Sequence, residues 1–390
     1  PVLAVINVIL GNVIVLIPIQ LNSHVGTKYG IPYPIFARMT FGNKGAKLST
    51  ISRSIIGCGW TSIQSWVGGG ALAALIGIVI PFFSDQSQTI SMPGNDNVMV
   101  GQLIGFAVFV LVCGWVAYNG MEKIKWVQNI SAPLLIVVIT GLIIWSIYTI
   151  YATGHSFMDV FRVGNNEALI EQNGGFAYVY LAGLTANIAY WATMALNIPD
   201  FSKMAKSQKD QFNGQLIGMP IPMAVCAIAG ALFAQATTYA YGTASYDPTT
   251  VFFYMSNPLA VAVCAIGVIV ATLTTCVAAN VVAPANGWSD LAPKKVSFKK
   301  GVIITIVISI FVMQPWFIYG SGSAYVFTWL NNYGTIIAPV AAILCADYFV
   351  CKQKRVDVAS LYHGANGRYA YSNGWNWCAV IAWAVSFIIP

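Results

Sequence analysis

The 390-residue chain is too apolar for a soluble globular protein, because only 8% of its residues are charged and 57% are hydrophobic. Soluble domains carry about a quarter charged residues, and the mean hydropathy here is +0.71. The net charge of +7 comes from basic residues that flank apolar stretches, so it indicates membrane topology and not a nucleic-acid partner.

Long charge-free stretches such as 54–84 and 301–346 exceed the roughly 20 residues that cross a bilayer as a helix. They lack the alternating pattern of a membrane β-barrel, so the predicted fold class is an all-α integral membrane protein. We expect about ten spans, near residues 1–20, 48–80, 98–118, 127–150, 176–198, 212–238, 258–283, 301–319, 322–350 and 375 onward.

The basic residues predict the orientation of these spans. Every Lys and Arg except Arg162 lies in the connection 21–47, at Arg53, or near Lys123, Lys203, Lys294 and Lys352. These are alternate connections, and the positive-inside rule places them in the cytoplasm, with both chain ends outside. The opposite connections hold acids instead, at Asp85, Asp96, Asp159, Glu167, Glu171 and Asp247. We therefore expect a multi-pass protein of the cell membrane.

The second predicted span places Trp60 and Gln64 four residues apart, on one helical face. Together they could stack on and hydrogen-bond a flat ligand. The alternative is that Trp60 only packs and that Gln64 bonds a neighbouring helix.

The fifth predicted span repeats this spacing with Asn187 and Trp191 and then ends at Pro199 and Asp200. Trp191 lies near the middle of the apolar stretch, away from the membrane interfaces where Trp is usually enriched. This position favours a functional interpretation of Trp191 more than that of Trp60.

The seventh predicted span carries Ala271, Thr274 and Thr275 on one face, where two hydroxyls and a backbone carbonyl could hold a cation. The alternative, favoured by the residues alone, is that the hydroxyls bond back to carbonyls of the preceding turn. Asn280 lies about 140° round an ideal helix from Thr275, so the helical wheel does not unite it with the Thr pair.

The ionisable residues argue against an enzyme. All acids fall in loops or at span ends, which disfavours a carboxylate proton relay at the bilayer midplane. The eight cysteines are scattered and the three histidines lie far apart, so neither a catalytic metal nor a cofactor is predicted.

Five motifs carry a resemblance to a known family. They are NSHVGTKYGIPYPIFARMTFG, GWTSIQSW, YWATMALNIPDFSKMAKSQKDQ, TTCVAANVVAPANGWSDLAP and CADYFVCKQKRVDVASLY. In this order they resemble the nucleobase–cation symporter family, across residues 1–390. The resemblance implies a leucine-transporter-like fold of two inverted five-helix repeats. The substrates of that family include hydantoins, allantoin, uracil, cytosine and other bases.

The resemblance also implies roles for particular residues. Trp60 and Trp191 match the two stacking Trp residues of a family member of known structure, and Gln64 and Asn280 match its hydrogen-bonding amides. Tyr190 stands where that member has a Gly, which narrows the pocket. Half of a sodium site is implied at Ala271, Thr274 and Thr275, with Thr274 in place of a Ser.

The implied organisation is a single transporter domain over 1–390. Residues 1–150 are expected to form the remainder of the first repeat, 176–350 the second repeat, and 375–390 the start of a peripheral helix. The motifs match family helices 2 to 11, with the first and last helices missing. Because the first helix supplies the other sodium ligands, we expect the 390 residues alone not to perform coupled transport.

Two functions are predicted as alternatives. The first is secondary active transport of a small flat nitrogen heterocycle, a nucleobase, allantoin or hydantoin, coupled to Na⁺ or, less favoured, H⁺. The second is a membrane sensor of the same fold that binds the ligand without transporting it. We expect a monomer in a lipid bilayer.

Overall fold

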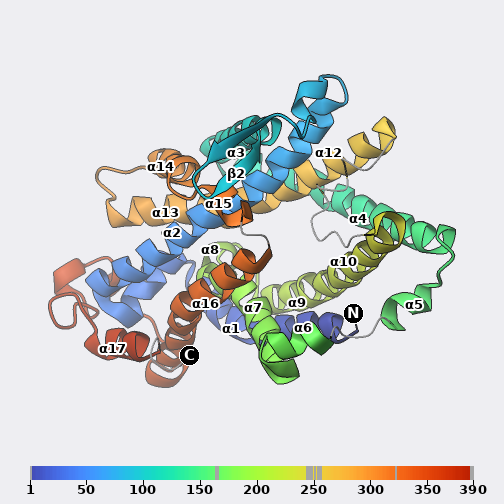
Figure 1. Ribbon diagram of the computed structural model, residues 1–390. Helices are drawn as coiled ribbons and strands as arrows, with labels where there is room; N and C mark the ends of the chain where they lie inside the picture. The colour runs from blue at the N-terminus through green and yellow to red at the C-terminus, as the bar shows by residue number, and fades with distance from the viewer. Residues whose placement is uncertain are drawn as a thin grey trace.

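The computed structural model describes residues 2–162, 167–242, 249, 252, 257–320 and 323–386. Helices make up almost all of this part of the chain, as Figure 1 shows. Among the described residues, seven helical segments are long and apolar enough to cross a membrane. These are Val2–Tyr29, Val100–Tyr118, Glu122–Ala152, Gly175–Asn197, Gln208–Tyr241, Pro258–Leu291 and Thr328–Cys351.

The corresponding elements are α1 (Val2–Tyr29), α3 (Val100–Tyr118), α4 (Met121–Ala152), α7 (Gly175–Asn197), α9 (Gln208–Gly218) with α10 (Pro220–Tyr241), and α16 (Ser323–Ala346) with the π-helical turn η3 (Asp347–Cys351). The segment Pro258–Leu291 consists of α12 (Pro258–Thr275), the π-helical turn η2 (Cys276–Val281) and α13 (Val282–Leu291). Six short helices lie between the longer elements: η1 (Pro81–Phe83), α5 (Phe157–Arg162), α6 (Glu167–Gln172), α8 (Pro199–Ser202), η4 (Ala359–Leu361) and η5 (Gly364–Asn366).

Three of the ten expected spans take a different form. The expected span 48–80 is part of α2 (Tyr33–Gly77), a bent helix of 45 residues. The expected span 301–319 is divided into α14 (Phe298–Phe311) and α15 (Pro315–Gly320), because Gln314 adopts a φ of 40° just before a proline. With 14 residues, α14 is about 21 Å long, less than the bilayer core of about 30 Å. The last expected span is α17 (Trp377–Val385), with 9 residues.

The segment 21–47, expected to be a connection, is almost entirely helical. No Pro lies between Leu21 and Tyr29, and Gly26 keeps a helical φ, so α1 continues to Tyr29. Gly30 ends it with a φ of 69°. α2 begins directly after Pro32 and bends at Gly42, whose φ of 78° and ψ of 170° interrupt the helix. The charged residues of this segment therefore lie on helices, which hydropathy alone does not indicate.

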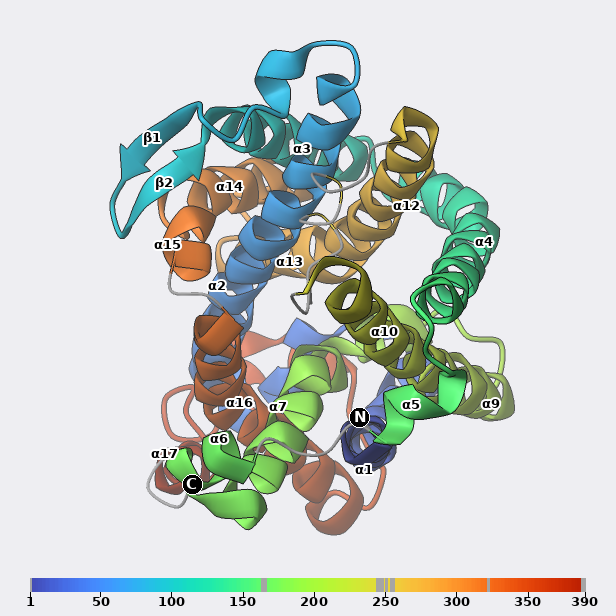
Figure 2. The same ribbon diagram turned by 45° about the vertical axis from the view of Figure 1, so that its right-hand side comes forward.

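Among the described residues, one two-stranded hairpin departs from the helical architecture. β1 (Thr89–Met92) pairs antiparallel with β2 (Asn95–Met99), with Thr89 opposite Met99. The Asn95 side-chain amide donates to the Trp316 carbonyl over 3.3 Å, so the hairpin lies beside α15 (Figure 2).

Helix α2 is the centre of the packing that positions the site. It runs diagonally through the molecule beside the continuous α12–η2–α13 segment, and α3 packs on it (Figure 1). Gly69 of α2 and Gly105 of α3 lie backbone to backbone, because a Cβ on either would collide with the other helix. Such small-residue contacts are how membrane helices approach closely. Helix α7 packs between α1 and α16.

Gly69→Ala should destabilise the protein by about 1–3 kcal/mol, because the added methyl overlaps the Phe106 backbone and forces α2 and α3 apart. Gly230→Ala is the matched control, since a Cβ there meets nothing within 4 Å. It should be neutral or stabilise α10 by up to about 1 kcal/mol. Thermal unfolding in detergent measures both; equal midpoints for the two variants would contradict the close α2–α3 contact.

Candidate functional site

One face of α2 carries Arg53, Gly57, Thr61 and Gln64, at spacings of four, four and three residues that align along a helix. This face lies against the π-helical turn η2 and the start of α13. At Gly57 a Cβ would collide with the ring of Pro284. The glycine therefore lets the two backbones come close enough for side chains of α2 to reach the carbonyls of η2.

Pro284 creates the need for those contacts. Proline has no N–H, so the carbonyl of Asn280, four residues earlier, lacks its usual helical donor. The Thr61 hydroxyl shares its one proton between this carbonyl and the Gly57 carbonyl of its own helix, both over 2.9 Å. Arg53 Nη2 donates to the neighbouring Ala279 carbonyl over 2.9 Å. Side chains of α2 thus stabilise an irregular turn of a kind that is common at functional sites.

The π-helical turn also unites residues that an ideal helical wheel separates. In a π-helix the hydrogen bond closes after five residues, which brings Asn280 back toward the side of Thr275. Both residues line one cavity of about 50 Å³ with Trp60, Gln64 and Trp191. The predicted substrate residues therefore do come together, and the π-helical turn supplies what the ideal helical wheel alone did not, the approach of Asn280 to Thr275. The remaining lining residues are Tyr190, Thr193, Met194 and Ala279.

Aromatic rings form the walls of this central cavity. Tyr190 is edge-on to Trp60, with ring centroids 5.6 Å apart, and edge-on to Trp191, with centroids 5.4 Å apart. Tyr333 packs edge-on against the other side of Trp60. Edge-to-face pairs of this kind are favourable, and the Tyr190 ring fills space between the two indoles. The buried indole N–H of Trp191 has no acceptor among the described residues.

Two amides face each other in the cavity. Asn280 Nδ2 donates to Gln64 Oε1 over 3.0 Å. No hydrogen bond from the described residues engages Gln64 Nε2 or the side-chain oxygen Oδ1 of Asn280. The pair therefore presents the amino group of Gln64 as a donor beside the Asn280 Oδ1 acceptor, a pattern complementary to a ring edge that carries C=O next to N–H.

The hydroxyls of the predicted cation site bond back within their own helix. Thr274 Oγ1 donates to the Val270 and Ala271 carbonyls over 2.9 and 3.0 Å, and Thr275 Oγ1 donates to the Ala271 carbonyl over 2.9 Å. This is the structural alternative considered above. Each hydroxyl is the donor in these bonds, so the lone pairs of its oxygen stay available to a cation.

Sequence reasoning missed Arg53, Thr61 and Asn197. Arg53 was grouped with the basic connections, but it is 2% exposed inside the bundle. The available signal was Pro284 four residues after a polar Asn280, which requires a donor from another helix. Asn187 lies outside the central cavity: it bonds the Asn7 side chain and the Gly183 carbonyl, both over 2.9 Å.

Comparisons with known proteins show similarity along almost the whole chain. A family model described as permease for cytosine/purines, uracil, thiamine, allantoin matches residues 2–390. The purine-uracil permease NCS1 of Arabidopsis thaliana is 35% identical over 98% of this chain and 62% of its own length. The allantoin permease of Bacillus subtilis is 30% identical over 95% of this chain and 73% of its own length. The chain thus spans between three fifths and three quarters of these two relatives.

Solved structures show the same fold. Mhp1, a nucleobase-cation-symport-1 family transporter in a closed conformation with bromovinylhydantoin bound, superposes with a TM-score of 0.76 over 99% of this chain and 80% of its own, at 21% identity. MhsT in complex with L-phenylalanine gives a TM-score of 0.59 at 15% identity. With the apolar helices, these likenesses establish an all-α membrane transporter fold.

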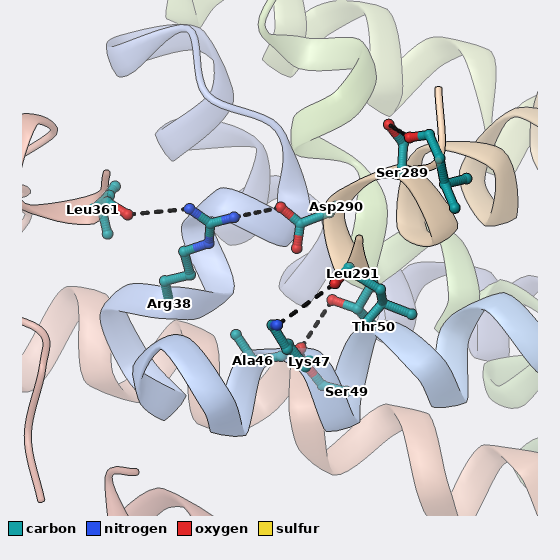
Figure 3. Close-up of polar contacts among 10 residues, drawn as sticks. Arg38, Ala46, Lys47, Ser49, Thr50, Ser289, Asp290, Leu291 and Leu361 are labelled. Atoms are coloured by element: carbon teal, nitrogen blue, oxygen red, sulfur yellow. Dashed lines mark hydrogen bonds and ion pairs between the residues drawn. The ribbon is translucent and has the colours of Figure 1, made fainter. Parts of the chain in front are cut away.

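Thr61→Val should destabilise the protein by about 1–3 kcal/mol, because the buried Asn280 carbonyl loses its donor. Thr50→Val is the matched control on the same helix. The buried Thr50 hydroxyl bonds only the Ala46 carbonyl one turn earlier (Figure 3), so its loss should cost less than about 1 kcal/mol. Thermal unfolding of both variants checks this; a larger loss for Thr50→Val would contradict the role of Thr61.

Proposed function

Because this chain belongs to the family of permeases for cytosine/purines, uracil, thiamine and allantoin, as its motifs predicted, we propose that its protein is a cation-coupled symporter of a small flat nitrogen heterocycle. The family consists of permeases and not of enzymes. The observation that carries the proposal is the Gln64–Asn280 pair, which presents a donor and an acceptor in a cavity between Trp60 and Trp191.

The substrate class follows from the walls and the polar pair. Uracil, allantoin and hydantoin each carry N–H groups beside C=O groups on a small ring, which matches the donor and acceptor of Gln64 and Asn280. Flat rings stack on indoles. The names of the relatives, purine-uracil and allantoin permeases, support the same class. A cavity of about 50 Å³ holds only a few water molecules, so ligand entry requires the Tyr190 ring to move.

The proposed coupling ion is sodium, held in part by Ala271, Thr274 and Thr275. The free lone pairs of the two hydroxyls support this role. A hard cation takes about six or more oxygen ligands, so further oxygens must come from other parts of the protein. Absence of a carboxylate at the centre of the predicted spans disfavours proton coupling.

The remaining parts of the proposal concern topology. We propose that the Lys- and Arg-rich connections face the cytoplasm, and that residues 1–150 and 176–350 belong to two inverted five-helix repeats. Residues 375–390 would begin a peripheral helix. The functional unit is proposed to be a monomer.

Uptake into vesicles tests the function. The full-length natural protein, reconstituted with an inward sodium gradient, should accumulate at least one of radiolabelled uracil, allantoin, hydantoin, cytosine or a purine. Binding without accumulation would support the alternative of a sensor, which no relative supports.

Trp60→Ala and Trp191→Ala should each weaken ligand binding. Stacking on an aromatic ring is worth about 1–3 kcal/mol, so the affinity should fall roughly 5-fold to over 100-fold. Trp66→Ala is the control, because Trp66 is buried on the same helix but packs against Phe106 and Trp316, outside the cavity. It should lower the unfolding temperature with little effect on the dissociation constant. Unchanged affinity in both cavity variants would refute the stacking model.

Thr275→Ala should reduce the enhancement of ligand affinity by sodium and leave the sodium-free affinity nearly intact, because an oxygen ligand is lost. Thermodynamic linkage requires an equal loss in the effect of ligand on sodium binding. Thr272→Ala serves as the control: its hydroxyl also bonds back, to the Val268 carbonyl, but lies off the cavity. Isothermal titration with and without sodium measures this. Uptake driven equally well by a pH gradient without sodium would rule out sodium coupling.

A further inference from the structure

Arg53 is a fully buried guanidinium inside a membrane bundle. Its side chain is 2% exposed, and it donates from Nε to Asn197 Oδ1 over 3.1 Å and from Nη2 to the Ala279 carbonyl over 2.9 Å. Burying a charge is costly, and an ionisable residue within a membrane protein usually has a functional role. The uncharged Thr61 donates to a carbonyl of the same turn, so hydrogen bonding to the backbone carbonyls alone does not require an arginine.

The contacts of Arg53 join three walls of the central cavity. Arg53 lies on α2, two turns or about 10.5 Å before Trp60. Asn197 ends α7, six residues after Trp191. Ala279 precedes Asn280 in η2. A single side chain therefore fixes how far the three elements lie apart below the ligand residues.

A second cavity lies beyond Arg53, next to the end of α7 and the start of α13. This cavity, the vestibule, has a volume of about 340 Å³. Its lining includes Asn197 at the end of α7, Asp200 and Lys203 just after that helix, and Ala283 and Asn286 of α13. It lies toward the lysine-rich side, which we propose to be cytoplasmic. The Arg53 junction thus separates the central cavity from the vestibule.

The junction is incompletely bonded. Arg53 Nη1 is buried without a hydrogen-bond partner among the described residues, and Arg53, Asn197 and Tyr33 line one small void. Buried polar groups in folded proteins nearly always have a hydrogen-bond partner. Because the Arg53 junction lacks one such bond, fewer bonds have to break when it opens. Asp200 lines the same void and accepts from the Tyr33 backbone N–H over 2.8 Å. Burial raises the pKa of its carboxyl, although that hydrogen bond, Lys203 and Arg53 oppose the shift.

We propose that Arg53 is a positioning residue for transport: it ties α7 to η2, holds Asn280 in place and closes the path from the central cavity to the vestibule. This inference rests on the proposed function. Substrate release on the lysine-rich side then requires Arg53 to part from Asn197 or Ala279.

Cysteine labelling from the lysine-rich side tests the closure. Met194→Cys places a thiol in the central cavity, in a background where the exposed Cys226, Cys351 and Cys378 are replaced by Ser. A membrane-impermeant thiol reagent should label it about 10-fold faster in Arg53→Gln than in the parent, with Arg53→Lys in between. Asn197→Asp, which turns the hydrogen bond into an ion pair, should slow the labelling at least about threefold.

Arg38→Gln is the matched control. Arg38 lies on the same helix but pairs with Asp290 and the Leu361 carbonyl (Figure 3), and it lines neither cavity. Its substitution should leave the labelling rate unchanged. In equilibrium Trp-fluorescence titrations with uracil and allantoin, Arg53→Gln should weaken binding about 10-fold, since Asn280 is released, whereas Arg38→Gln should not.

Wild-type labelling and wild-type affinity in Arg53→Gln would overturn the inference. If Arg53→Gln does not fold, Asn197→Asp decides: labelling as fast as in the parent, or faster, overturns it. Failure of the parent protein to accumulate any of the heterocycles would instead refute the proposed function, because the labelling result does not depend on transport.

Discussion

A carbonyl that loses its helical donor in a membrane bundle needs a new one from within the protein, since lipid offers none. Pro284 imposes this requirement on Asn280, and Thr61 of α2 meets it. For the hydroxyl to reach, α2 has to lie almost in backbone contact with α13, which Gly57 permits. The positions of the α2 cavity residues follow, because Trp60 and Gln64 lie within one turn of Thr61 on the same helix.

The resulting polar site is only partly satisfied without a ligand. The Gln64–Asn280 hydrogen bond occupies one donor and one acceptor, and a ligand gains little from the site unless it bonds both remaining groups. A ring with only one of the two functions would leave a desolvated polar atom unpaired, at a cost of about 1–3 kcal/mol. Selection by hydrogen-bond pattern therefore comes from the amides. The aromatic walls, including Tyr190, select for size and flatness.

The sequence allowed prediction of the membrane class, most helices and the facing pair Trp60 and Gln64, because charge-free length and four-residue spacing translate directly into structure. Family resemblance was needed for Asn280 and Tyr190. Helical-wheel reasoning failed at Asn280 because it assumes 3.6 residues per turn, and the π-helical turn does not obey it. Arg53 was misplaced because charge was taken as a sign of a connection. Hydropathy does not register a guanidinium whose bonds lie inside the bundle.

The short span from Thr275 to Asn280 bears on how the proposed functions could be coupled. Thr275 belongs to the proposed cation site, Ala279 to the junction with Arg53 and Asn280 to the polar pair, all within six consecutive residues. Two-state coupling needs an element whose arrangement each site biases differently. A π-helical turn suits that role, since its carbonyls are bonded by side chains of α2 and not only by its own helix. Movement of this one turn would change the cation site, the polar pair that binds the ligand and the exit path together. The proposed coupling therefore needs no long-range pathway.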